Sequence, residues 1–184
     1  MPRHLTTQEL LNGLPHILAS PKDNGDVKGL VIRPVTNERL ELQTCEISLA
    51  RGMHGDHWAD GCWMTTADGS PEPDVQICIM NARCINLIAQ ERNNWAPAGD
   101  NLFVDMDITP DNTPPGTCLS IGSAVIEITE VPHNGCAKFI ERFGRDACVF
   151  VNTGEGKRLR LRGIYARVVQ DGTLSVGDRI SKIR

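Results

Sequence analysis

The sequence feature that most constrains the fold is a change in the spacing of apolar residues at Gly29. From there to Ile180, apolar residues return at every second position in short runs, which Gly, Pro, Asn and Asp residues separate. This alternation is typical of β-strands, and the separating residues favour turns. The runs predict strands at residues 29–33, 38–49, 75–80, 102–108, 118–131, 159–170 and 178–180. We therefore expect a mainly β fold with minor α, a closed or partly closed barrel with parallel and antiparallel neighbours and a few short helices.

Before Gly29 the apolar spacing is helical. Residues 6–19 carry an apolar stripe, a Thr that can cap the start and Glu9 in the first turn, and together these predict a helix. Pro15 should kink this helix or divide it in two. We accordingly divide the chain into a helical N-terminal extension, residues 1–27, and a barrel domain, residues 28–184.

Two more short helices are expected within the barrel domain. Asn81 can cap one of them, and residues 139–143 fit the other. Residues 147–151 fit either a strand or an extension of that second helix. Barrels commonly build ligand sites at their mouths, from loops. The candidate loops lie at residues 51–58, 97–101 and 132–136.

Charge and composition exclude several classes of function. The net charge is -4 and aromatic residues make up 4% of the chain, which does not suit a protein that holds nucleic acid by phosphate contacts or base stacking. The start of the chain lacks the apolar core of a secretory signal, and no run reaches the ~18 apolar residues of a spanning helix. We expect a cytoplasmic protein without nucleic-acid or membrane partners. Its 7 cysteines show no two-residue spacing of zinc or redox motifs, so most are expected to be free thiols that fill apolar space.

One cysteine has a different setting. Cys136 follows Pro132 and Gly135, between a predicted strand and a predicted helix, which places it in a turn rather than in a packed stripe. A thiol there can meet a ligand, and Lys138 would favour its thiolate form. A thiolate can carry sulfur or bind a soft metal. The alternative is an ordinary surface cysteine.

Several short motifs, taken in order, resemble the MOSC family, which is named for the C-terminal domain of molybdenum cofactor sulfurases. The motifs are Arg51–His57, Ala98–Leu102, Leu119–Glu127, His133–Phe139, Arg162–Val168 and Gly172–Ile180. Each is weak alone, but their order from about residue 28 to the end is specific. One departure stands out: many members have Arg and Pro just before the motif cysteine, where this chain has Asn134 and Gly135.

The resemblance implies a barrel of mixed strands that handles a molybdenum cofactor or transfers sulfur through the motif cysteine, here Cys136. In relatives that are enzymes, this cysteine binds molybdenum and the reaction reduces N-hydroxylated substrates. The chain shows no flavin, iron–sulfur or nicotinamide motif, so a partner reductase would supply electrons. In fused sulfurases the domain follows a pyridoxal-phosphate desulfurase, for which these residues leave no room. Pyridoxal phosphate is thus a family-level association only.

Histidines and one aspartate are candidates for the catalytic or cofactor site. His133 could orient the ligand or move a proton, since the ordinary pKa of histidine lies near neutrality; the alternative is a turn cap. His54, Asp56 and His57 lie on a glycine-flanked loop. We expect them in the cofactor pocket, with Asp56 as a hydrogen-bond acceptor and His57 as a donor. A zinc site would need further ligands from elsewhere, and a purely structural turn is the remaining alternative.

Four more residues, together with Lys138, complete the predicted cofactor site. Asp100 and Asn101 would contact the amide edge of the pterin, or else bond to their own backbone. Arg160 and Arg162 belong to a basic segment of a predicted strand and suit the cofactor's terminal phosphate; a solvated charged face is the alternative.

Three hypotheses for the function follow. The chain is an enzyme that uses molybdenum, or it is a non-catalytic module that delivers sulfur or cofactor to a partner. Such a carrier would hold a persulfide on Cys136, with a cysteine desulfurase as a possible partner. The third is a generic barrel with an incidental cysteine.

Overall fold

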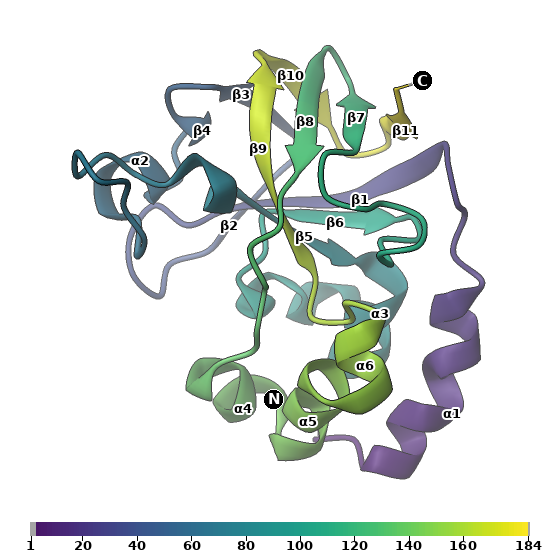
Figure 1. Ribbon diagram of the computed structural model, residues 1–184. Coiled ribbons are helices and arrows are strands. Elements are labelled where there is room, and N and C mark those ends of the chain that lie inside the picture. Colours follow the sequence, from purple (N-terminus) through teal and green to yellow (C-terminus); the bar gives the residue numbers. More distant parts are fainter. Residues whose placement is uncertain (1–2, 184) are drawn as a thin grey trace.

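The structure, a computed structural model, describes residues 3–183. Its centre is a closed barrel (Figure 1) in which the order of neighbouring strands is β11, β7, β8, β9, β5, β6 and β1, and β1 pairs back to β11. Their bounds are β1 (Gly25–Ile32), β5 (Ile77–Asn81), β6 (Leu102–Asp105), β7 (Cys118–Ile121), β8 (Ala124–Ile128), β9 (Ile164–Gln170) and β11 (Arg179–Lys182). The β5–β6 pair is parallel and the other pairs of the ring are antiparallel. The predicted mixed barrel is confirmed.

Four short strands extend this barrel at one side. β2 (Leu40–Leu42) pairs with β1, and a separate three-stranded sheet is formed by β3 (Thr44–Ser48), β4 (Gly52–Met53) and β10 (Gly172–Ser175). The sheet positions the loop that follows β4, which leads into the short helix α2 (Trp58–Gly61).

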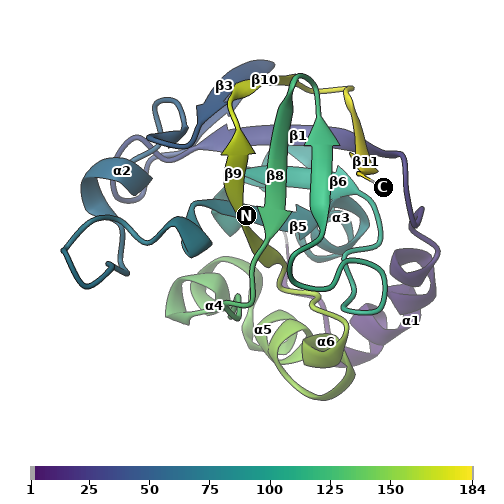
Figure 2. The same cartoon turned by 45° about the horizontal axis from the view of Figure 1, so that its top comes forward.

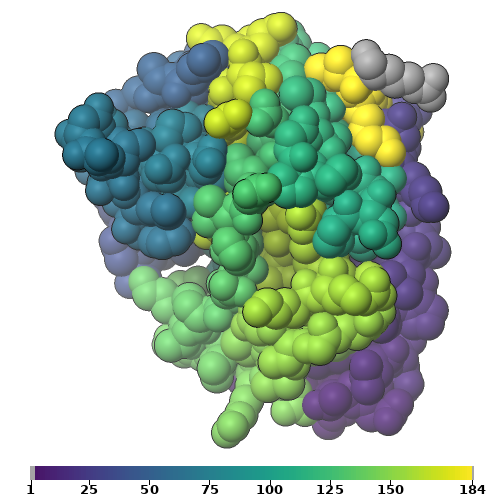
Figure 3. Space-filling view, in the orientation of Figure 1, coloured from purple at the N-terminus to yellow at the C-terminus, as the bar shows by residue number. Residues whose placement is uncertain are grey.

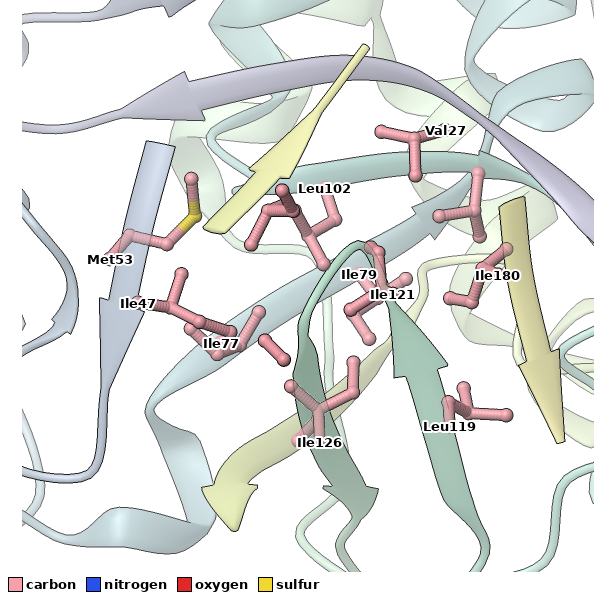
Figure 4. Packing of buried hydrophobic residues seen from close by; sticks show 14 of the residues in the cluster. Val27, Ile47, Met53, Ile77, Ile79, Leu102, Leu119, Ile121, Ile126 and Ile180 are labelled. Carbon is pink, nitrogen blue, oxygen red and sulfur yellow. The ribbon is translucent and has the colours of Figure 1, made fainter. Parts of the chain in front are cut away.

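The barrel is filled by side chains. Figure 4 shows Ile77, Ile79, Leu102 and Ile126 directed into its interior, where each is at most 1% exposed. Burying an aliphatic side chain of this size contributes roughly 1.5–3 kcal/mol of transfer free energy. The barrel interior is therefore a packed core that supports the fold, and a ligand has to bind elsewhere.

Helices cover one side of the barrel, as Figures 1 and 2 show. They are α1 (Thr7–Leu18), α3 (Ala82–Ala89), α4 (Ala137–Phe143), α5 (Arg145–Asn152) and α6 (Gly154–Arg158). Single 3-10 turns lie at Pro73–Val75, Arg92–Asn94 and Ala96–Ala98. A second core joins these helices to the outer face of the barrel, around Leu10, Met80 and Phe103. No helix in the described part of the chain is long and apolar enough to cross a membrane.

The predicted helices form with the expected caps. Thr6 and Glu9 make a reciprocal capping box at the start of α1, which continues through Pro15 as one helix. The Asn81 side chain accepts hydrogen bonds from the first turn of α3. Residues 147–151, for which strand and helix were both open, belong to helix α5.

The long predicted strand at residues 159–170 is half wrong. Only Ile164–Gln170 forms strand β9, and residues 159–163 turn. Arg160 has a positive φ of 55° and Gly163 one of 112°. A Cβ atom at Gly163 would stand 2.3 Å from the Ile79 carbonyl oxygen, so the backbone approaches β5 here more closely than a continuing strand could. The basic residues of this segment consequently lie on a helix and a turn rather than on one strand face.

Candidate functional site

The segment of residues 129–136, which we call the strap, joins β8 to α4 without regular secondary structure. A cavity lies on each side of it. The α2-side pocket has a volume of about 590 Å³ and the α6-side pocket about 580 Å³. In Figure 3 the strap is the green column between the barrel and the helices, with a hollow on either side. Pro132, His133, Asn134 and Arg162 line both pockets and so form their common wall.

The inner side of the α2-side pocket includes the outer wall of the barrel. Cys78 of β5 and Tyr165 of β9 line it. Their neighbours along each strand, Ile77 and Ile79 for Cys78 and Ile164 and Ala166 for Tyr165, belong to the barrel core. Alternate residues of a strand face opposite sides, so Cys78 and Tyr165 face outward. The three candidate loops all contribute lining residues, but they assemble against the wall of the barrel rather than at its mouth.

Charge distinguishes the α2-side pocket. Its lining contains no carboxylate, and its cations are Arg33, Arg39, Lys138, Arg142 and Arg162. Two of them, Arg33 and Arg162, are neutralised from beneath by buried aspartates. The other three have no carboxylate partner among the described residues.

The first buried pair joins Arg33 to Asp56. The Nε and Nη2 groups of Arg33 each donate to the Asp56 carboxylate at 2.9 Å, and Asn101 Nδ2 donates to the same carboxylate at 3.0 Å. Burial raises the pKa of Asp56, but the hydrogen bonds and charge of Arg33 outweigh burial and hold this pKa below its ordinary value. Asp56 is 4% exposed, so it orients Arg33 and does not line the pocket.

The second buried pair joins Arg162 to Asp100. Arg162 Nη1 donates to both carboxylate oxygens, at 2.9 and 2.8 Å, and Nη2 donates to the Ala98 carbonyl at 3.1 Å. The guanidinium also lies over the Phe139 ring, 5.0 Å from its centroid. Burial raises the pKa of Asp100, while the charge and hydrogen bonds of Arg162 oppose that rise. This pair fixes the guanidinium in the common wall of the two pockets.

His133 stands in the same wall. Its ring stacks against Tyr165 with centroids 4.4 Å apart, and its Nδ1 lies 3.6 Å from Asp100 Oδ1 without a hydrogen bond. Burial, and then the charges of Arg162 and Arg33, lower the pKa of His133 well below its ordinary value. The imidazole is therefore neutral near pH 7, and the expectation that its pKa lies near neutrality is wrong.

The unpaired cations make the α2-side pocket attractive to anions. Arg39 Nε is buried and has no hydrogen-bond partner among the residues that the structure describes. Burial, and then the charges of Arg142 and Arg33, lower the pKa of Arg39. In the described part of the chain, Arg142 and Lys138 donate only to neutral oxygens, of Pro97 and Asn37 respectively. A bound anion would relieve the repulsion among these groups.

Two thiols of this pocket differ in exposure. Cys136 is exposed and lies at the start of α4, where its side chain caps nothing. Cys78 is buried, its Sγ accepts a hydrogen bond from Arg33 Nη1 at 3.4 Å, and burial raises its pKa. Since a thiolate is the nucleophile and metal ligand, Cys136 is the better placed of the two to meet a ligand.

The structure separates the predicted site residues into three groups. Cys136, His133, His57, Lys138 and Arg162 come together around the α2-side pocket.

A second group supports the first from below: Asp56, Asp100 and Asn101 are buried, and Asn101 Nδ2 also donates to the Val31 carbonyl at 3.1 Å. The last group lies outside the α2-side pocket. His54 lines neither pocket and contacts Ser48 and Glu46. Of the two pockets beside the strap, Arg160 lines the α6-side one.

Sequence reasoning missed Arg33, Arg39, Arg142 and Tyr165, which carry much of the pocket. Arg39 and Arg142 fall outside the motifs and read as surface charges in the sequence. Within residues 3–183, no three His, Cys, Asp or Glu side chains meet in an arrangement that could hold a metal ion. A metal at Cys136 would thus need ligands that the protein does not provide.

A family model described as the MOSC domain matches residues 53–181. Among solved structures, one of a hypothetical protein aligns with a TM-score of 0.59 at 19% identity, over 89% of this chain and 70% of its own. The YuaD protein of Bacillus subtilis aligns with a TM-score of 0.58 at 17% identity, over 85% and 94%. YiiM of Escherichia coli aligns with a TM-score of 0.54 at 19% identity, over 88% and 69%. At these identities the likeness shows the fold. No curated protein matches the chain.

Proposed function

Since the chain belongs to the MOSC domain family, we propose that its α2-side pocket binds a molybdenum cofactor, with Cys136 as the protein ligand to molybdenum. The observation that carries this proposal is an exposed thiol on a pocket whose charged lining residues are all cationic. A pterin cofactor is anionic through its phosphate, and a soft thiolate suits its metal.

The residues present fit such a group. A volume of about 590 Å³ lies within the range of about 300–1,000 Å³ typical of small-molecule sites. The unpartnered Nε of Arg39 can donate to a phosphate oxygen, and Arg142 and Lys138 add two cations without carboxylate partners. Arg39, Lys138 and Arg142 would hold the phosphate, and Cys136 the metal.

When bound, the cofactor supplies two-electron redox chemistry at molybdenum. We expect reduction of an N-hydroxylated substrate: the N–O bond breaks, oxygen leaves as water, and two electrons and two protons are consumed. A partner reductase would provide the electrons. Within this chain, the Arg162–Asp100 pair holds the wall of the pocket, and His133 presents a neutral imidazole that can form a hydrogen bond to a ligand without adding charge.

Metal analysis tests the cofactor proposal. The chain is produced in cells that make molybdenum cofactor, and molybdenum per protein is measured for the native protein and for Cys136→Ser. Native protein should contain molybdenum and Cys136→Ser should lose most of it. Cys62→Ser is the matched control, because Cys62 lines the same pocket and its removal should leave the metal in place. Equal molybdenum in native protein and Cys136→Ser would contradict the proposal.

The exposure of Cys136 also supports a second candidate function, a sulfur carrier. A desulfurase persulfide would transfer its terminal sulfur to the Cys136 thiolate, which forms the new S–S bond as the donor's S–S bond breaks and its thiolate leaves. Mass spectrometry after incubation with a cysteine desulfurase and cysteine should then show one added sulfur atom on Cys136. If the protein gains sulfur on Cys136 but contains no molybdenum and shows no turnover, the sulfur carrier is favoured over the enzyme.

A further inference from the structure

The α6-side pocket is a second cavity that the proposed cofactor does not use. It lies between the strap, helix α6 and the loop that carries Pro110, and Figure 3 shows it as the recess beside the strap, above α6. Its apolar walls come from Pro110, Val131, Val151 and Ile164, and its cations are Lys157, Arg158, Arg160 and Arg162. A volume of about 580 Å³ suits a small organic molecule.

Two of these cations are already neutralised. Arg158 pairs with Glu155, and Arg162 pairs with Asp100. Lys157 has no hydrogen-bond or ion-pair partner among the described residues. Arg160 donates from Nη1 to a neutral oxygen, the Thr113 carbonyl, at 2.8 Å.

The backbone holds Arg160 in place for a ligand. Its φ of 55° lies in the left-handed region, which is uncommon for a residue other than glycine. The turn is closed by a hydrogen bond from the Gly163 N–H to the Arg160 carbonyl at 2.8 Å. The side chain is half-buried, so it is anchored beside the cavity rather than spread into solvent.

Two unsatisfied polar atoms lie on residues of the wall that this cavity shares with the α2-side pocket. Arg162 Nε and His133 Nδ1 are buried and have no hydrogen-bond partner within residues 3–183, and the two side chains are 8% and 7% exposed. Buried polar atoms normally have partners. These two atoms therefore support a bound ligand on grounds that do not depend on the charges of Lys157 and Arg160.

We propose that the α6-side pocket is a separate binding site for a small phosphate monoester, in which Lys157 and Arg160 bind the phosphate and the apolar walls contact its organic part. Two cations without carboxylate partners match the charge of a phosphate dianion, and a guanidinium can donate two parallel hydrogen bonds to it. Glu130, the one carboxylate of the lining, is exposed to solvent. The site is distinct from the cofactor pocket because the strap separates the two.

Binding of phenyl phosphate to the full chain tests this site. Amide resonances report the location, because Gly154 and Gly163 line the α6-side pocket whereas Gly61 and Gly99 line the α2-side pocket. Titration with phenyl phosphate should shift the amide resonances of Gly154 and Gly163 until they saturate. Its affinity at this site should be higher than that of inorganic phosphate or phenol. Shifts confined to Gly61 and Gly99, or equal affinity for phenol, would overturn the proposal.

Two variants assign the phosphate contacts. Arg160→Gln should weaken binding about tenfold or more, because it removes charge-assisted hydrogen bonds. Lys157→Gln should weaken it several-fold, and since Lys157 is exposed without a partner among the described residues, we expect this variant to fold as the native protein does. Arg142→Gln, in the other pocket, is the matched control and should leave the shifts of Gly154 and Gly163 unchanged. Unchanged affinity in Lys157→Gln and Arg160→Gln together would contradict the assignment.

A final pair of measurements separates this inference from the proposed function. Cys136→Ser should bind phenyl phosphate as the native protein does, whether or not the chain uses molybdenum. In protein loaded with molybdopterin, phenyl phosphate should still bind at Gly154 and Gly163. Its exclusion there would mean that the cofactor's own phosphate takes the cavity, and the proposal of a separate site would fall.

Discussion

The two pockets beside the strap have similar volumes and a common wall, yet their cations are held differently. On the α2 side, three of five cations lack a carboxylate partner and one of them, Arg39, has a buried nitrogen without any partner. On the α6 side, two of four cations lack a carboxylate partner among the described residues, and the lining includes one solvent-exposed carboxylate, Glu130. The number of basic residues around a cavity therefore says less about its ligand than the number that remain unpaired and desolvated.

The largest predicted loss of stability concerns the common wall of the two pockets. Asp100→Asn leaves the Arg162 charge buried without its ion-pair partner, which should cost about 3–5 kcal/mol of the free energy of unfolding. Urea denaturation measures the loss. Asp74→Asn removes a carboxylate from a pair with Arg167 whose side chains are 39% and 42% exposed, and should cost less than about 1 kcal/mol.

Equal, small losses in Asp100→Asn and Asp74→Asn would mean that water reaches Arg162 in the variant. The common wall would then be open to water, and the two pockets would not be independent sites.

A smaller effect should appear in the dependence of stability on pH. Because the folded pKa of His133 lies well below 6.5, the unfolded chain binds the extra proton first as the pH falls. The contribution of His133 is fully present above 6.5 and is lost below it, by up to about 1.4 kcal/mol per pH unit until the folded pKa is reached. Comparing denaturation at about pH 7 and about pH 5 should show a flatter dependence in His133→Gln than in the native protein.

His54→Gln serves as the control for the pH measurement. His54 is an exposed side chain outside both pockets, so the comparison isolates the buried imidazole of the common wall. A His133→Gln protein with the same dependence as the native protein would show that His133 is protonated at little cost, and therefore that the wall is hydrated.

The smallest predicted stability effect has the opposite sign. Arg39→Met removes a guanidinium whose Nε is buried without a partner and which Arg142 and Arg33 repel. We expect the free energy of unfolding to rise by about 1 kcal/mol or less, while phosphate binding, followed at Gly61 and Gly99, weakens about tenfold.

Arg51→Met provides the comparison for Arg39→Met, because Arg51 is exposed and paired with Asp60; its stability should change by at most about 0.5 kcal/mol. If Arg39→Met destabilised the protein and left phosphate binding intact, the α2-side pocket would not be organised around an anion.

Much of the fold followed from the sequence because it depends on local rules. Apolar alternation determines which residues can face a barrel core, and Ile77, Ile79 and Ile126 do so. The capping residues Thr6 and Asn81 began their helices as predicted, since a cap needs only the next few backbone N–H groups. The turn around Cys136 likewise indicated an exposed thiol.

The pocket itself was decided by tertiary structure. Arg162 and Asp100 are 62 residues apart in the chain, and no local pattern marks them as partners. Arg33 and Arg39 come from the first part of the barrel and Arg142 from a helix beyond the strap, so their shared pocket exists only once the barrel closes. The sequence by itself determined the barrel and an exposed Cys136, because periodicity and turn chemistry act over a few residues. Which charges are paired, and which of two pockets Cys136 serves, depends on contacts between distant segments that only the folded chain brings together.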